Sequence, residues 1–176
     1  MTTPAAVQTR NVPLLDLQAQ FATIRSEIMA TLGTVAESQK FILGEDVKKL
    51  EEEIGAYSQA QFAVGCASGS DALMLALMAY GIGPGDEVVT VPYTFFATGG
   101  AIHRLGATPV YIDVDPDTFN MNVDQLRGAL ERSPNVKAII PVHLFGACAD
   151  MDPICDLARE RGIPVIEDAA QAIGSE

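Results

Sequence analysis

Short β-rich runs alternate with helical patterns from residue 62 onward, and this alternation limits the fold more than any other feature. The β-rich runs are Phe62–Cys66, Glu87–Val91, Pro109–Asp113, Ala138–His143 and Pro164–Glu167. The helical patterns between them are Asp71–Tyr80, Thr98–Leu105, Val123–Glu131 and Pro153–Arg161. Connections of this length can hold a crossover helix, so we expect parallel strands that are covered on both faces. The sequence therefore predicts an α/β domain with a mainly parallel sheet and helices on both faces.

Two helices are predicted before this alternation. Apolar residues between Leu17 and Val35 recur at spacings of three and four, which places them on one face of a helix, and Asp16 is its expected N-cap. The segment Gly44–Ser58 repeats the pattern and carries charged residues on its outer face. We therefore expect a disordered N-terminus over residues 1–11, a helical segment over 12–58, and the α/β domain over 59–176.

Composition argues against several kinds of partner. The 23 acidic and 11 basic side chains give a net charge of −12, which disfavours binding to a nucleic-acid backbone. No apolar run reaches the roughly 18 residues of a membrane span, and the polar start has no signal-peptide pattern. The 3 cysteines form no CxxC pair and only 2 histidines are present, so no metal site is expected. These features predict a cytoplasmic protein without nucleic-acid or membrane partners.

Small and hydroxyl residues follow the first predicted strand. In an open parallel sheet, ligands bind beyond the carboxyl ends of the strands. Gly69, Ser70 and Asp71 stand there and open a helix, whose free N–H groups and dipole favour an anion such as phosphate. An ordinary N-cap by Ser68 or Ser70 is the alternative interpretation.

Aromatic and acidic residues follow three other predicted strands. The segment Pro92–Thr98 holds aromatic rings that could stack on a flat ligand or pack in the core. His143 could bind a ligand or cap local backbone groups. Glu167 and Asp168 end a buried strand, where a carboxylate needs a partner unless it is a solvated helix cap. A protonated pyridine nitrogen would be such a partner. Together with the phosphate site, these features predict a pyridoxal 5′-phosphate (PLP) pocket.

Several segments, in this order, resemble the DegT/DnrJ/EryC1/StrS family. They are Gly69–Leu73, Gly83–Val88, Pro92–Thr98, Pro141–Gly146 and Glu167–Gln171, and the resemblance extends over about residues 12–176. Members of this family are PLP-dependent sugar aminotransferases of the aspartate aminotransferase fold, fold-type I. The resemblance implies that residues 59–176 are an incomplete PLP-binding large domain and that the C-terminal small domain is absent.

The resemblance also implies which residues contact the cofactor. They are Gly69, Ser70, Asp71, Phe95, His143, Asp168 and Gln171. Ser70 and the backbone amide that follows it would bind the phosphate, and Phe95 would stack on the pyridine ring. Asp168 would pair with the ring nitrogen and Gln171 would lie near the phenolic oxygen. His143 is expected near the cofactor.

The lysines bear on catalysis. In this family the lysine that forms the Schiff base follows the Asp168 motif. Every lysine up to Glu176 precedes that motif, namely Lys40, Lys48, Lys49 and Lys137. The 176-residue chain alone is therefore expected to be inactive.

The family suggests a function for the parent protein. It implies transfer of an amino group, from glutamate, to a nucleotide-linked keto-sugar by a homodimer in polysaccharide biosynthesis. Two alternatives stay open. One is a PLP- or PMP-dependent sugar dehydratase, in which histidine replaces the lysine, and the other is a truncated, non-catalytic paralogue.

Overall fold

The computed structural model describes residues 12–13 and 15–175. The expected disordered stretch over residues 1–11 lies outside them. Internal contacts divide the chain into one compact unit that ends at Ala63 and a second that starts at Val64. The sequence placed this boundary after Ser58.

The first unit contains helices α1 (Leu17–Ser38) and α2 (Glu45–Tyr57). Both predicted helices are confirmed. Asp16 caps α1, because its carboxylate accepts a hydrogen bond from the Ala19 amide at 2.9 Å. None of the α1 residues is buried, and even Phe21 within its apolar stripe is 40% exposed. The apolar stripe of α1 therefore contributes little core.

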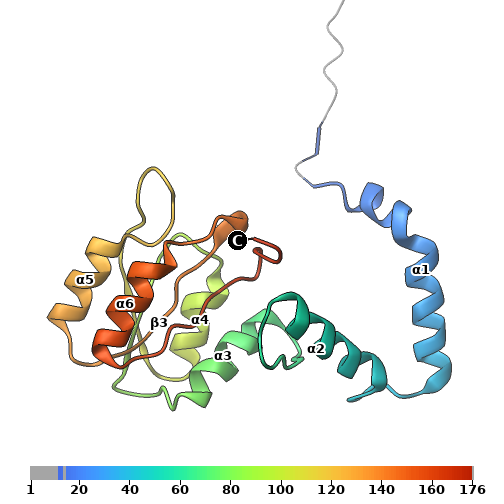
Figure 1. Cartoon of the computed structure of the whole chain (residues 1–176), viewed down its shortest axis with the longest axis horizontal. Coiled ribbons are helices and arrows are strands. Elements are labelled where there is room, and N and C mark those ends of the chain that lie inside the picture. Colours follow the sequence, from blue (N-terminus) through green and yellow to red (C-terminus); the bar gives the residue numbers. More distant parts are fainter. Residues whose placement is uncertain (1–11, 14, 176) are drawn as a thin grey trace, which may run out of the picture. The chain divides into compact units, whose positions relative to one another are not determined.

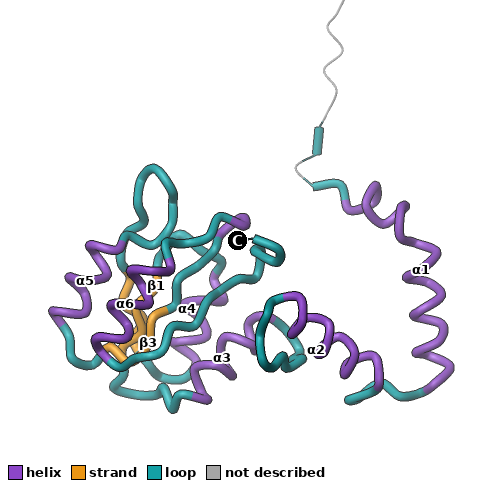
Figure 2. The backbone as a smooth tube through the Cα atoms, in the orientation of Figure 1, coloured by secondary structure: helices purple, strands orange, loops and turns teal. Residues whose placement is uncertain are grey.

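The second unit is built on a three-stranded parallel sheet, seen in Figure 2. Its strands are β1 (Glu87–Thr90), β2 (Thr108–Tyr111) and β3 (Val136–Ile139), in the order β2-β1-β3. In the register, Val89 pairs with Val110 on one side and with Ile139 on the other. The predicted parallel arrangement is confirmed, and β3 starts and ends earlier than the run Ala138–His143.

Helices cover both faces of this sheet, as predicted. They are α3 (Gly69–Ala79), α4 (Phe96–Arg104), α5 (Val123–Arg132) and α6 (Met151–Arg161). Val88 lies in a buried cluster with Leu77 of α3 and with residues of α4. Val89, which points to the opposite face, lies in a second cluster with Leu126 of α5 and with residues of α6. The helices α5 and α6 lie side by side over that face (Figure 1).

The predicted strand at Phe62–Cys66 is wrong. This segment forms no strand, and Phe62 and Val64 are exposed. A β-rich run becomes a strand only where a neighbour supplies the hydrogen-bond ladder. None of the described strands pairs with this run, so its apolar side chains stay at the surface.

The predicted last strand, Pro164–Glu167, is present only in part. It runs parallel to the end of β3 and meets it at two isolated bridges, Ile139 with Val165 and Val142 with Asp168. Between these bridges Pro141 has no N–H to donate, which interrupts the ladder. The position and direction of the segment are as predicted, and they bring Asp168 beside the residues that follow β3.

The helices also bear on membrane insertion. Within residues 12–13 and 15–175, no helix combines the length and the apolar character that crossing a bilayer requires.

Candidate functional site

The N-terminus of α3 is the place where the sequence predicts an anion site. Ser68 is the N-cap, since its hydroxyl accepts from the Asp71 amide at 3.2 Å and donates to the Asp71 carboxylate at 3.0 Å. The cap alternative is therefore confirmed for Ser68. Among the described hydrogen bonds, none uses the amides of Gly69 or Ser70. A Cβ on Gly69 would meet no atom within 4 Å, so an anion can approach these two amides closely.

The aromatic residues before α4 lie at the surface rather than in the core. Phe95 is the N-cap residue of α4 and its side chain is 73% exposed, which leaves a ring face available. Phe96 is also exposed, and a Cβ on Gly100 would lie 3.1 Å from its ring. Tyr93 packs against Phe119 with ring centroids 5.9 Å apart. The core-packing alternative does not hold for Phe95 and Phe96.

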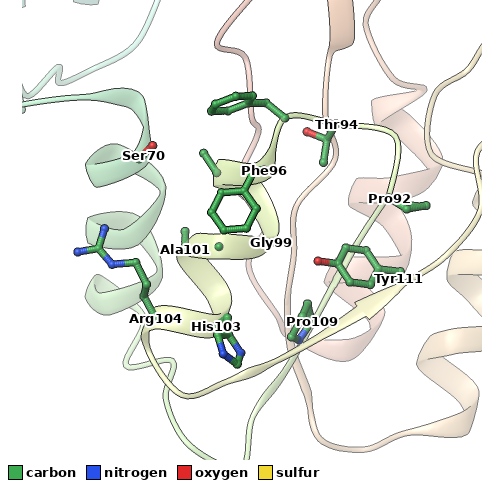
Figure 3. A pocket seen from close by; sticks show the side chains of 13 residues that line it. Ser70, Pro92, Thr94, Phe96, Gly99, Ala101, His103, Arg104, Pro109 and Tyr111 are labelled. Carbon is green, nitrogen blue, oxygen red and sulfur yellow. The ribbon is translucent and has the colours of Figure 1, made fainter.

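Ser70 and Phe95 line one pocket of about 720 Å³ (Figure 3). The pocket follows α4 from Ser70 on α3 to Pro109 and Tyr111 on β2, whose hydroxyl points toward α4. His143, Asp168 and Gln171 do not line it. The structure therefore brings Ser70 and Phe95 into one hollow, and the other three residues lie outside its lining.

Asp168 is buried and well anchored. Its Oδ2 accepts from the hydroxyl of Thr98 at 2.7 Å, and its Oδ1 accepts from the Ala170 amide at 3.4 Å. Its backbone N–H donates to Pro141, and its carbonyl accepts from the His143 amide at 3.1 Å. The partner that burial of this carboxylate requires is thus Thr98, on the first turn of α4.

Thr98 was not predicted as a site residue. It lies 70 residues from Asp168 in the sequence. The sequence nevertheless held a clue, because the carboxyl ends of parallel strands meet at the same edge of a sheet. A hydroxyl residue at the start of the helix that follows β1 is therefore expected near the residues that follow the other strands. Thr94, four residues earlier, places its hydroxyl 2.8 Å from that of Thr98.

His143 is buried, and both of its ring nitrogens bind protein groups. Nδ1 accepts from the Ala149 amide at 3.1 Å, and Nε2 lies 2.8 Å from the Glu167 carboxylate. Because an amide donates to Nδ1, the ring proton is on Nε2 and is donated to Glu167. Glu167 thereby gains a partner, although its side chain is 53% exposed. His143 ties β3 to the segment before Asp168, and its nitrogens are not offered to a ligand.

Gln171 is held by the turn after β3. Its Oε1 accepts from the Phe145 amide at 2.9 Å, so its Nε2 carries the donors that remain. Phe145 belongs to the short 3-10 helix η1 (Leu144–Gly146). Gly146 has a φ of +88°, and a Cβ there would lie 3.3 Å from the Gln171 carbonyl. Glycine therefore suits both the backbone and the space at this turn.

A loop beside the aromatic segment contains a perturbed carboxyl group. The backbone N–H groups of Thr118 and Asp117 donate to Asp115, and these bonds hold the pKa of its carboxyl group below the ordinary 3.8. The same loop carries Phe119, which packs against Tyr93. The loop thereby supports the segment that presents Phe95.

Comparison with known proteins identifies the family. The family model of the DegT/DnrJ/EryC1/StrS aminotransferases matches residues 22–176. The chain belongs to this family. It is 54% identical over 166 residues to a protein of Geobacillus stearothermophilus named "Pleiotropic regulatory protein". It is 48% identical over 169 residues to a UDP-N-acetyl-3-dehydro-α-D-glucosamine 3-aminotransferase of Acidithiobacillus ferrooxidans.

The match covers most of this chain and part of each relative. It includes 94% and 96% of this chain but 44% and 45% of the two relatives, so the chain spans less than half of their length. Two solved structures agree. DesV of S. venezuelae superimposes with a TM-score of 0.90 at 41% identity, covering 94% of this chain and 44% of DesV. NtdA of Bacillus subtilis, solved with bound PMP, superimposes with a TM-score of 0.89 at 34% identity, and the match covers 95% of this chain and 38% of NtdA. The chain has the fold of part of a fold-type I large domain.

Proposed function

We propose that these residues form the cofactor-binding part of a PLP-dependent aminotransferase that acts on a nucleotide-linked keto-sugar, with glutamate as amino donor. The observation that carries the proposal is the buried carboxylate of Asp168, fixed by Thr98 at the carboxyl edge of a parallel sheet. The family and its structural neighbours imply PLP. The name of the A. ferrooxidans relative supports a nucleotide-sugar substrate.

The chemistry of the side chains fits this cofactor. The amides of Gly69 and Ser70 and the Ser70 hydroxyl would hold the phosphate, since they face open space at a helix N-terminus. The Asp71 amide, which is already capped by Ser68, would contribute less. Phe95 would stack on the ring. The bound cofactor supplies an electron sink for the carbon that gains or loses the proton.

The remaining residues would act on the edge of the ring. Asp168 would keep the ring nitrogen protonated through a charge-assisted hydrogen bond. Gln171 would donate from Nε2 to the phenolic oxygen, since its Oε1 is held by Phe145. His143 would support Asp168, because its amide donates to the Asp168 carbonyl and its ring fixes Glu167.

We also propose that residues 1–176 are inactive by themselves. Lys48 lies 3.9 Å from Glu52 on the exposed face of α2, and Lys137 is exposed on β3. No lysine follows Asp168 within these residues to form the Schiff base. The proton transfers at the substrate would depend on that lysine.

We further propose that the active protein is a cytoplasmic homodimer that serves polysaccharide biosynthesis. The charge of −12 supports the absence of nucleic-acid partners. The helices described support the absence of a membrane partner.

The test is an amino-transfer assay with the complete protein expressed from its gene. Glutamate and a panel of nucleotide keto-sugars should give the amino-sugar and 2-oxoglutarate. Asp168→Asn should abolish the transfer, whereas Asp152→Asn, at an exposed position on α6, should leave it unchanged. Absence of turnover with any amino donor would contradict the proposal. Loss of a substrate hydroxyl as water without net transfer would indicate the dehydratase, and cofactor binding without turnover would indicate the non-catalytic paralogue.

A further inference from the structure

Two threonine hydroxyls form a chain that ends on Asp168. Thr98 is fully buried, and its Oγ1 lies 2.7 Å from Asp168 Oδ2 and 2.8 Å from Thr94 Oγ1. Both distances are typical of strong O–H···O hydrogen bonds. These two hydrogen bonds connect the segment that carries Phe95 with the Asp168 carboxylate, which does not itself line the pocket shared by Ser70 and Phe95.

The direction of these hydrogen bonds follows from the groups involved. An ionised carboxylate only accepts, so Thr98 donates its single proton to Asp168. Thr94 must then donate to Thr98, because the Thr98 proton is already used. The Phe95 carbonyl lies 3.3 Å from the Thr98 hydroxyl and can accept only a weaker, shared hydrogen bond from the same Thr98 proton.

We infer that Thr98 is a positioning residue, which fixes the Asp168 carboxylate so that Oδ1 meets the cofactor's ring nitrogen. Oδ2 is occupied by the short bond from Thr98, whereas Oδ1 has only the 3.4 Å contact with the Ala170 amide. Oδ1 is therefore the oxygen available to a donor on the ring. The inference rests on the proposed function, in which Asp168 pairs with that nitrogen.

Loss of the Thr98 hydroxyl would release the carboxylate. The buried Oδ2 would lack a donor, and Asp168 would turn toward other donors or water. If the Asp168 side chain then adopts the rotamer that can bind the ring nitrogen only about a tenth of the time, the apparent Kd for the cofactor rises about tenfold.

The experiment uses the complete protein and pyridoxamine 5′-phosphate labelled with ¹⁵N in its ring. Affinity is measured by titration, and protonation of the ring nitrogen by its ¹⁵N chemical shift. Thr98→Val keeps the shape of the side chain and removes the hydroxyl. The matched control is Thr90→Val, because Thr90 is equally buried and donates to the Ile140 carbonyl instead.

The expected result separates positioning from a purely structural role. Thr98→Val should raise the Kd about tenfold and move the ring ¹⁵N shift toward that of an unprotonated pyridine. Thr98→Ser, which restores the hydroxyl, should recover both readouts, and Thr90→Val should change neither.

The outcomes distinguish this inference from the proposed function. If the wild-type protein does not bind the labelled compound, or if Asp168→Asn leaves the ¹⁵N shift unchanged, the proposed function fails and the inference fails with it. If Asp168→Asn moves the shift but Thr98→Val behaves as wild type, only the inference is overturned. Equal effects of Thr98→Val and Thr90→Val would also overturn it.

Discussion

His143→Ala is expected to destabilise the fold strongly, because the imidazole joins two segments through both nitrogens. Its removal leaves the buried Ala149 amide without its acceptor. That loss costs about 1–3 kcal/mol. The lost bond to the half-exposed Glu167 adds at most about 1 kcal/mol, and the cavity left by the imidazole adds roughly 1–2 kcal/mol. The free energy of unfolding should therefore fall by about 4 kcal/mol in total.

Two further variants test the cause of this loss. Glu167→Gln should cost less than about 1 kcal/mol, because the amide oxygen still accepts from Nε2–H and the side chain is 53% exposed. His103→Ala is the matched control. His103 is exposed on α4, so its removal should change the stability by less than about 0.5 kcal/mol.

The assay is urea unfolding followed by circular dichroism, with all variants measured at pH 7. The ring assignment can be checked in parallel by NMR, which should show the proton of His143 on Nε2. The reasoning is refuted if His143→Ala unfolds within about 1 kcal/mol of the wild type. It is equally refuted if Glu167→Gln costs as much as His143→Ala, since the Ala149 bond would then not matter.

Further predictions concern the cap, the turn and the loop. Ser68→Ala should lower the stability by about 1 kcal/mol through loss of the α3 cap, whereas Ser70→Ala should not, and thermal melting compares the two. Gly146→Ala should cost about 1–3 kcal/mol, because φ is +88° and the new Cβ would press on the Gln171 carbonyl; an unchanged melting temperature would contradict this. The pKa of Asp115 is lowered in the folded chain, so its stabilisation is present above the ordinary 3.8 and is lost as pH falls through the folded value. Asp115→Asn should therefore lower the melting temperature at pH 7, and the difference should disappear as the pH falls through the lowered pKa of Asp115.

The sequence predicts the sheet well because β-rich runs and helical patterns alternate regularly along it. Alternating runs and crossover helices imply parallel strands, and the two buried clusters on β1 residues Val88 and Val89 confirm helices on both faces. Phe62–Cys66 shows the limit of this reasoning, because β-propensity reports the side chains and not the presence of a pairing strand. The run is apolar, yet no described strand pairs with it.

The sequence predicts which residues stand at the candidate site, but it does not predict the hydrogen bonds that they make. The position of Asp168 after a buried run implies that its carboxylate needs a partner, and the structure identifies that partner as Thr98, 70 residues earlier. The sequence left His143 open between ligand binding and a local cap. Its bonds to Ala149 and Glu167 depend on how the turn after β3 folds back, which no periodic pattern encodes.

The central claim is that Ser70, Phe95 and Asp168 belong to one PLP pocket, and cofactor binding tests it most directly. Fluorescence titration of the complete protein with pyridoxamine 5′-phosphate needs no Schiff base. Ser70→Asp, Phe95→Ala and Asp168→Ala should each weaken binding about tenfold or more, through phosphate repulsion, lost stacking and loss of the ring-nitrogen partner. Wild-type affinity in all of these variants would contradict the claim.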